Sequence, residues 1–491
     1  MISSCQMMNV RTARISYRKK SLSSCWFLGY AISRGPGFSQ HKCLFSWAFT
    51  SNGGNAFPAP KLLQKDTLST SSNINELARI LREVHERSST DGVMKDFVPE
   101  LLAQHSKLDS DWIIELALEA GKFQSGVASS ILHGVMAGTT SQQQYQLAPQ
   151  LFQSLCRDNQ QRVSIDLVTC ALAFNSCQLA LKSIDKISKN NSYFSAVSES
   201  CLEAAFKLAK KGGGSAQRKA MSQAKRAKTK AQVNARATES KNILKEKYDL
   251  EILYEDDQVV CLNKPAGMVC YHNRQTTKGK RGEDTSLENA LLSVVTLSLV
   301  NQDARGIVHR IDRGTSGCIV MAKTDEAHLM LVAEFFSRRA KKSYLALVDG
   351  AVQEKKGVLD LPIGGQPSRS MYEVKQIYKG SSHPTTSTLV EVFTETGRKH
   401  QVRIHCAQGL GCPIYLDNLY YPKPAIKDSK KRTGDHNTDK LLIPRSIDTV
   451  KAAHEPGHRF FLHASKLQIP AFGIDIEAPL PSWWREAIDH L

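Results

Sequence analysis

Residues His309 to Gly317 read HRIDRGTSG and lead into the apolar run GCIVMAK, which spans residues 317 to 323. The nonapeptide places one carboxylate, Asp312, between two arginines in a segment of glycine and hydroxyl side chains. An aspartate in a polar turn is commonly a capping or solvated residue. The rest of the chain decides between this structural role and a chemical one.

Four further blocks accompany this loop. ILYEDDQVVCLNKPAG (252–267) precedes it, and KKSYLALVDG (341–350), TGRKHQVRIH (396–405) and FLHASKLQIP (461–470) follow it. This ordered set resembles the RluA-type pseudouridine synthase family over roughly residues 248–491. The resemblance implies an isomerase that converts specific uridines of RNA to pseudouridine.

The second half of the chain has the texture of short strands. Runs rich in β-branched and aromatic residues recur, and between them DEAHLMLVAEFFSRR predicts an amphipathic helix capped by Thr324 or Asp325. Few connections repeat as βαβ units, so the pattern favours an α+β fold around a largely antiparallel sheet. The resemblance implies the same class: a pseudouridine synthase fold with a mixed, largely antiparallel sheet and a central cleft, preceded by an all-α region.

The resemblance also assigns three catalytic residues. Asp312 matches the catalytic carboxylate, which acts either as a nucleophile or as the base that removes a ribose proton. Arg403 matches the basic residue that pairs with it, and a nearby cation keeps an enclosed carboxylate ionised. Tyr344 matches the tyrosine that stacks on the target base and helps to move a proton.

Three basic residues are candidate RNA contacts. Arg310 matches an arginine that enters the RNA stack where the base has left, and a phosphate contact is the alternative. Arg313 follows Asp312 directly, and Lys264 lies in the NKPAG block. For Lys264 the alternative is a role in positioning a strand and a loop.

No cofactor or metal is expected. Pseudouridine formation needs no redox step and no group donor, which is consistent with a chain that lacks a dinucleotide loop, a phosphate loop and a metal cluster motif. The twelve cysteines contain no CxxC pair and no zinc-type spacing, so reduced thiols acting as small core residues are predicted. The expected partner is RNA, and the expected oligomeric state is a monomer.

Three departures from the family pattern concern the surroundings of the site. Ile311 replaces the more usual Leu, MVCYHN follows NKPAG where relatives have an apolar run ending in His-Pro, and YLDNLYY replaces a Gly-Asp-containing block ending in Tyr-Gly. These changes affect loops that flank the pocket. They leave the proposed catalytic trio intact.

The net charge of +18 is unevenly distributed. Residues 1–65 contain nine Lys and Arg and no acidic residue, a composition typical of an organelle transit peptide. We therefore predict that residues 1–60 are a transit peptide or bipartite leader for a mitochondrion or plastid; a disordered basic tail is the alternative. No apolar stretch approaches the roughly 20 residues of a membrane span, so a soluble mature protein is expected.

Between the leader and the synthase region lie a predicted helical region, residues 66–206, and a basic linker, residues 207–247. Apolar residues recur at helical spacing, and some segments begin about 35 residues apart, which suggests helical repeats; a generic bundle is the favoured alternative. The linker holds 13 basic and 2 acidic residues. It is predicted either to contact RNA phosphates or to be a solvated connection.

The leading hypothesis is an organellar RNA pseudouridine synthase acting on rRNA, tRNA or mRNA. One alternative is an inactive RNA-binding or ribosome-assembly protein that keeps the fold, although retention of the catalytic trio argues against it. A helical-repeat adaptor that carries the synthase domain is a third possibility. Which RNA and uridine are modified, which organelle is involved and what the helical region does stay open.

Overall fold

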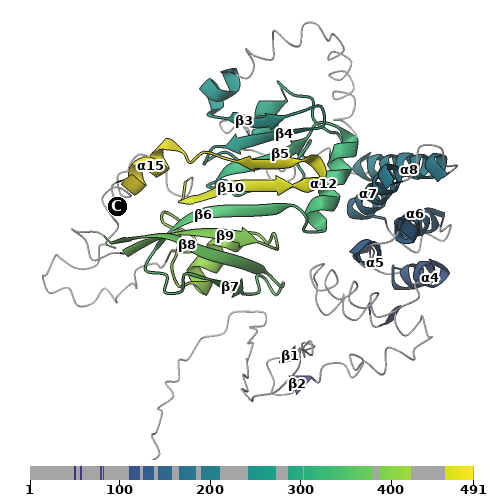
Figure 1. Ribbon diagram of the computed structural model, residues 1–491, viewed down its shortest axis with the longest axis horizontal. Coiled ribbons are helices and arrows are strands. Elements are labelled where there is room, and N and C mark those ends of the chain that lie inside the picture. Colours follow the sequence, from purple (N-terminus) through teal and green to yellow (C-terminus); the bar gives the residue numbers. More distant parts are fainter. Residues whose placement is uncertain are drawn as a thin grey trace, which may run out of the picture. The chain divides into compact units, whose positions relative to one another are not determined.

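The structure is a computed structural model of the 491-residue chain (Figure 1). The described residues are 49–50, 56–57, 78–79, 81, 110–121, 125–137, 142–157, 165–183, 190–210, 242–272, 286–292, 294–301, 304–379, 386–421, 459–489 and 491. The chain divides into two compact units, Met1–Leu68 and Ser69–Leu491. In the first unit, the described strands β1 (Phe49–Thr50) and β2 (Ala56–Phe57) pair antiparallel. The rest of the predicted leader lies outside the described residues.

Five helices lie between residues 110 and 210 in the described part of the chain. They are α4 (Ser110–Gly121), α5 (Ser125–Ala137), α6 (Gln142–Arg157), α7 (Leu167–Ser183) and α8 (Asn190–Lys210). Consecutive helices pack on one another and bury their aliphatic and aromatic residues. Such packing is common to repeat arrays and bundles, so both interpretations stay predictions. None of the described helices has the length and apolar character of a membrane span.

The helices are tied together by polar as well as apolar contacts. Asp166 caps α7, because its carboxylate accepts hydrogen bonds from the Thr169 amide at 2.7 Å and the Ser129 hydroxyl of α5 at 2.8 Å. In the same unit, α7 packs against α12 (Asp325–Phe336). Most of the predicted linker, residues 211–241, lies outside the described residues, and a helix follows it at 242–248.

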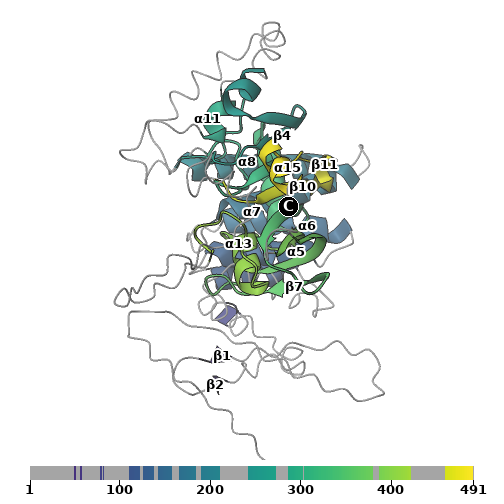
Figure 2. The same ribbon diagram turned by 90° about the vertical axis from the view of Figure 1, so that its left-hand side faces the viewer.

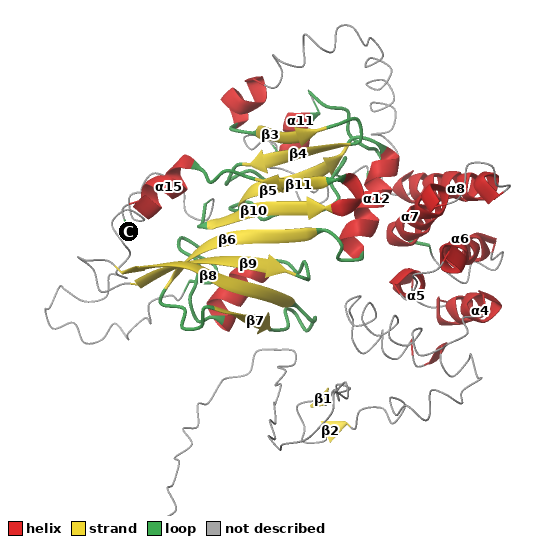
Figure 3. Cartoon of the chain, in the orientation of Figure 1, coloured by secondary structure: helices red, strands yellow, loops and turns green. Residues whose placement is uncertain are grey.

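The strands after residue 248 form one nine-stranded sheet, drawn in yellow in Figure 3. Its order is β3-β4-β5-β10-β6-β9-β8-β7, and β11 pairs with β10. Only β5 and β10 pair in parallel among these named strands, which confirms the predicted mixed, largely antiparallel sheet. The strands are β3 (Glu251–Glu255), β4 (Val259–Lys264), β5 (Ser316–Ala322), β6 (Lys341–Asp349), β7 (Lys356–Asp360), β8 (Arg369–Lys379), β9 (Thr386–Thr394), β10 (Leu462–Ile469) and β11 (Ile474–Glu477).

The local sequence explains the central strand and the helix that follows it. All seven residues of β5 are buried, as expected for a continuous apolar run in the middle of a sheet. Thr324 caps α12, because its hydroxyl accepts a hydrogen bond from the Ala327 amide at 3.2 Å. The helix ends at Phe336, three residues before the predicted Arg339, since Arg338 adopts a left-handed φ of 58°.

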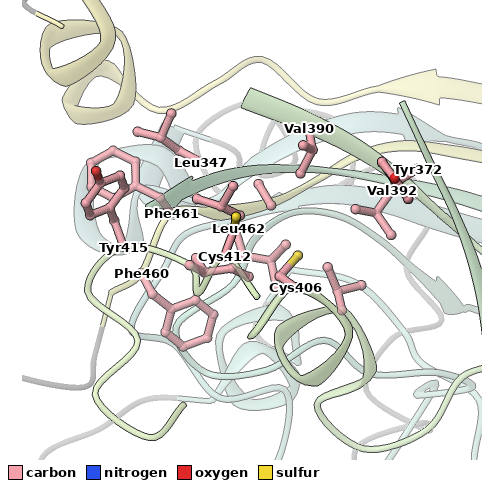
Figure 4. Close-up of a cluster of buried hydrophobic side chains, with 14 of the residues drawn as sticks. Leu347, Tyr372, Val390, Val392, Cys406, Cys412, Tyr415, Phe460, Phe461 and Leu462 are labelled. Atoms are coloured by element: carbon pink, nitrogen blue, oxygen red, sulfur yellow. The ribbon is translucent and has the colours of Figure 1, made fainter. Parts of the chain in front are cut away.

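Three apolar clusters hold the sheet and its helices. One lies under α12, a second under α11 (Leu287–Leu291), and the third joins β6 and β9 to α13 (Gln401–Ile404) and α15 (Ser482–Asp489). Helices α11 and α13 are labelled in Figure 2. Figure 4 shows the third cluster, in which side chains of β6 and β9 gather with side chains of β8, of residues 406–415 and of residues 460–462. The labelled residues are Leu347, Tyr372, Val390, Val392, Cys406, Cys412, Tyr415, Phe460, Phe461 and Leu462.

Two short helical segments complete the described fold. A π-helical turn, His405–Gly409, continues α13, and a 3-10 turn, Pro470–Phe472, connects β10 to β11. The nine described cysteines are free thiols, and all except Cys156 are buried. The eight buried thiols fill core positions in the way that the sequence pattern predicts.

Candidate active site

The loop that carries Asp312 packs directly on the segment that forms β10. A Cβ atom at Gly314 would lie 2.3 Å from a ring carbon of Phe460, and one at Gly317 would lie 2.2 Å from the Ala464 carbonyl oxygen. Gly317 also has a φ of +110°, which side chains rarely tolerate. Both positions therefore require glycine. The close contacts with Phe460 and Ala464 fix the position of the loop against the start of β10.

His309 anchors the start of this loop. Its Nε2 accepts a hydrogen bond from the Val320 amide at 3.0 Å, and its ring stacks on Phe335 with the ring centres 4.4 Å apart. Burial lowers the pKa of His309 to about 3, so the ring is neutral and fixed as an acceptor. A turn follows, in which the Thr315 amide donates to the Asp312 carbonyl at 3.1 Å.

A second buried histidine anchors the other end of the loop. His463 Nε2 lies 3.0 Å from the Ala478 carbonyl oxygen, and its Nδ1 lies 2.9 Å from the Ser316 hydroxyl. Because a carbonyl only accepts, Nε2 carries the proton and Nδ1 accepts from Ser316. Burial lowers the pKa of His463 to about 4, which keeps this arrangement neutral.

The Asp312 side chain meets Arg403 of α13. Arg403 Nη1 donates to Asp312 Oδ2 at 3.2 Å. The other edge of the guanidinium makes two hydrogen bonds of 2.7 Å to both carboxylate oxygens of Asp417. The Asp417 side chain is 1% exposed, whereas that of Asp312 is 20% exposed. Arg403 is therefore held from behind by a buried carboxylate and presents its remaining edge to an accessible one.

Aromatic rings enclose the same guanidinium. The Arg403 carbon Cζ lies 4.4 Å from the centre of the Phe460 ring and 5.1 Å from that of Tyr420. Burial alone would lower the pKa of Arg403, but the hydrogen bonds and charges of Asp417 and Asp312 outweigh it and raise that pKa. Arg403 is thus a permanent cation beside Asp312.

Tyr344 approaches the site from β6. Its side chain is partly buried against the second and third apolar clusters. Burial, followed by the negative charge of Asp312, raises the pKa of Tyr344, so its phenol stays protonated. Its hydroxyl makes no hydrogen bond to any residue that the structure describes. The structure therefore brings all three predicted catalytic residues to one place.

Lys264 and Arg313 join the NKPAG loop to the Asp312 loop. Lys264 is fully buried, and its ammonium donates to the carbonyl oxygens of Pro265 and Met268 at 2.8 Å and of Arg313 at 3.3 Å. Arg313 Nε donates to the Gly267 carbonyl at 2.8 Å. A fully buried ammonium with three carbonyl partners fits the alternative, in which Lys264 positions the two loops, and its contact with RNA stays a prediction.

Arg310 has a different environment from these two residues. It is exposed, and its Nη1 lies 3.4 Å from the Tyr271 hydroxyl, a long contact. This placement leaves its side chain accessible to RNA, and the RNA contact stays a prediction.

Sequence reasoning missed two groups at this site. Asp417 lies in YLDNLYY, which stood out only as a departure from the family pattern, and its preceding residue Leu416 has a left-handed φ of 65°. His400 directly precedes α13, and its Nε2 lies 3.8 Å from Asp312 Oδ1. The position of His400 three residues before Arg403, in the block TGRKHQVRIH, was the available signal.

In the described part of the chain, no group of three or more His, Cys, Asp or Glu side chains could hold a metal ion. The sequence model of the RNA pseudouridylate synthase family matches residues 258–408 of this chain. The uncharacterized RNA pseudouridine synthase YlyB of Bacillus subtilis is 36% identical over 265 residues, which cover 52% of this chain and 76% of that protein. This chain belongs to the RNA pseudouridine synthase family.

Ribosomal large subunit pseudouridine synthase D of Nitrosomonas europaea is 37% identical to this synthase over 200 residues, which cover 37% of the chain and 54% of that protein. Among solved structures, human RNA pseudouridylate synthase domain containing 4 has 21% identity and a TM-score of 0.35, and the match covers 52% of this chain and 97% of that one. The synthase is an isomerase, in agreement with the resemblance of its sequence blocks.

Proposed function

We propose that this RNA pseudouridine synthase modifies specific uridines in the rRNA, tRNA or mRNA of a mitochondrion or plastid. The observation that carries the proposal is the position of Asp312, whose partly exposed carboxylate lies 3.2 Å from an Arg403 that is itself fixed by Asp417. This arrangement places a carboxylate beside a fixed cation where a nucleotide can reach it.

The chemistry breaks the bond between N1 of the uracil and C1′ of the ribose, turns the base, and joins C5 to C1′. Asp312 acts either as the nucleophile at C1′ or as the base that removes a ribose proton. Arg403 holds it in place through the hydrogen bond to Oδ2, and the protonated Tyr344 supplies an aromatic face for the base. Arg310 occupies the space that the target base leaves in the RNA, or binds a phosphate.

Three features support the substrate class and the location. Relatives named ribosomal large subunit pseudouridine synthase D make rRNA the first substrate to test. The acid-free, basic composition of residues 1–65 supports an organelle, and the basic linker supplies charge for sequence-independent contacts with phosphates.

The test is site-resolved mapping of pseudouridine in organellar RNA from cells with and without the protein. Loss of individual pseudouridines on deletion, restored by the wild-type chain and not by Asp312→Asn, is the expected result. A fluorescent fusion of residues 1–60 should enter a mitochondrion or plastid.

An unchanged map, together with no conversion by the purified protein, would favour the second candidate, an RNA-binding or ribosome-assembly protein that keeps the fold. Diffuse cytosolic fluorescence of the fusion would overturn the location alone.

A further inference from the structure

The two oxygens of the Asp312 carboxylate have different surroundings. Oδ2 accepts the hydrogen bond from Arg403, whereas Oδ1 accepts none from any described residue. The basic atom that faces Oδ1 is His400 Nε2, at 3.8 Å, which is longer than a hydrogen bond. A nucleotide that reacts with Asp312 must approach the oxygen that is not engaged. It would then lie next to the His400 ring.

The His400 ring is held in place from the opposite side. Its Nδ1 lies 2.9 Å from the Tyr420 hydroxyl, and the two rings meet edge to face with their centres 5.8 Å apart. The backbone of His400 adopts a left-handed φ of 58°, and its side chain is 19% exposed. The ring is therefore oriented by Tyr420, and Nε2 points to the side where Asp312 is accessible.

His400 is also the group beside Asp312 that is suited to accepting a proton. Arg403 is always protonated, and the Lys264 ammonium donates hydrogen bonds to three carbonyl oxygens. Tyr344 keeps its proton, because its pKa is raised. Burial, and next the charge of Asp312 acting against it, leave the pKa of His400 below its ordinary value, so its imidazole is neutral at pH 7.

We propose that His400 is a further catalytic residue, which carries the proton that leaves C5 of the target base. The proposal rests on the proposed function. After C5 has joined C1′, the C5–H bond breaks, its electron pair returns to the ring, and the proton passes to His400 Nε2. The same proton then goes to N1 of the turned base, so that the enzyme ends the cycle unchanged.

The surroundings fit both states of the ring. With Nδ1–H donating to the Tyr420 oxygen, Nε2 keeps its lone pair for the proton. Once His400 is protonated, the negative charge of Asp312 at 3.8 Å stabilises the imidazolium. The other charged groups that act on His400 are Arg403, Lys399 and Asp417, and the two cations favour release of the proton afterwards.

The experiment uses the full-length protein, RNA that the wild type converts, and the same RNA with deuterium at C5 of uridine. His400→Asn is the principal variant, because Asn tolerates the left-handed backbone but cannot titrate. Turnover should fall by about 10²-fold or more. A deuterium isotope effect on kcat should appear that the wild type lacks, since proton removal from C5 becomes rate-limiting.

Two further variants separate chemistry from structure. His400→Gly also suits the backbone, and imidazole added to it should restore turnover in proportion to the neutral imidazole present. Tyr420→Phe removes the partner of Nδ1 and should lower kcat by about 10-fold with little change in KM. The matched control is Tyr378→Phe, which removes a phenol hydroxyl from β8, where residue 378 pairs with Ser387.

The pH profile gives an independent measure. Wild-type kcat should decrease as pH falls below the ordinary histidine value of about 6.5, and this decrease should be absent in His400→Asn. Wild-type turnover in His400→Asn, or reduced turnover with no isotope effect and no rescue by imidazole, would overturn the proposal. A wild-type protein that forms no pseudouridine on any RNA would instead overturn the proposed function.

Discussion

Replacing Asp417 by Asn tests whether the position of Arg403 depends on its buried ion pair with Asp417. The substitution keeps the size of the side chain and one acceptor oxygen. It removes the negative charge of Asp417 and one of the two oxygens that accept hydrogen bonds of 2.7 Å from Arg403. The Arg403 side chain is 8% exposed, so water cannot replace the lost partner. Removing one member of such a buried ion pair costs about 3–5 kcal/mol. We expect a loss near the lower end, about 3 kcal/mol, because one acceptor is retained.

The same change should reduce catalysis. A guanidinium that has lost Asp417 turns toward Asp312 and engages the oxygen that the nucleotide needs. Displacement of a reacting group by about 1 Å costs up to about 10²-fold in rate, and we expect kcat to fall by about that factor. Urea unfolding followed by tryptophan fluorescence measures the stability, since Trp484 is buried in the cluster next to this site. Single-turnover conversion of a target RNA measures the rate.

The matched control is Glu391→Gln, which breaks the surface ion pair between Glu391 and Lys375, 2.8 Å apart. Lys375 keeps Glu373 as a second partner, so the free energy of unfolding should change by less than about 1 kcal/mol. If Asp417→Asn is as stable and as active as this control, Arg403 does not depend on Asp417 and our account of the site is wrong.

Three further predictions concern Asp312, the basic linker and His463. Asp312→Asn should abolish conversion while the protein stays folded and binds RNA, and residual turnover of the purified variant would remove Asp312 from its catalytic role. Neutralising the Lys and Arg residues at 218–230 should weaken RNA binding and flatten its dependence on salt, because fewer counterions are released; equal affinity across a salt series would mark a passive linker. The pKa of His463, lowered by burial to about 4 from an ordinary 6.5, means that the unfolded chain binds more protons between these values. About 3 kcal/mol of stability should therefore be present above pH 6.5 and lost as the pH falls to 4, and His463→Gln should show a smaller loss in urea unfolding at pH 7, 5.5 and 4.

Local patterns predicted much of the fold and the centre of the site. The apolar run after Asp312 forms a fully buried central strand. The helix predicted from the apolar spacing after Thr324 is also present, and Thr324 caps it. Asp312, Tyr344 and Arg403 came from blocks that each carry a recognisable sequence, and the chain folds them together.

What could not be predicted depends on contacts between distant segments. The ion pair of Arg403 with Asp417 requires a loop whose sequence departs from the family pattern. In that loop Leu416 has a left-handed φ, a conformation that leucine rarely adopts and that its sequence therefore does not predict. The burial of Lys264, with its ammonium bonded to three carbonyl oxygens, could not be predicted either, because a lysine in a loop is normally solvated.

The parallel pairing of β5 with β10 has a consequence for biosynthesis. Ser316 and Gly317 lie opposite His463 and Ala464, about 150 residues later, and β10 then separates β5 from β6 in the sheet. A nascent chain can pair β4 with β5 before β10 exists, but the Asp312 loop cannot pack on Phe460 and Ala464 until β10 has left the ribosome. We therefore expect that a growing chain carries no assembled catalytic centre until β10 (Leu462–Ile469) has left the ribosome.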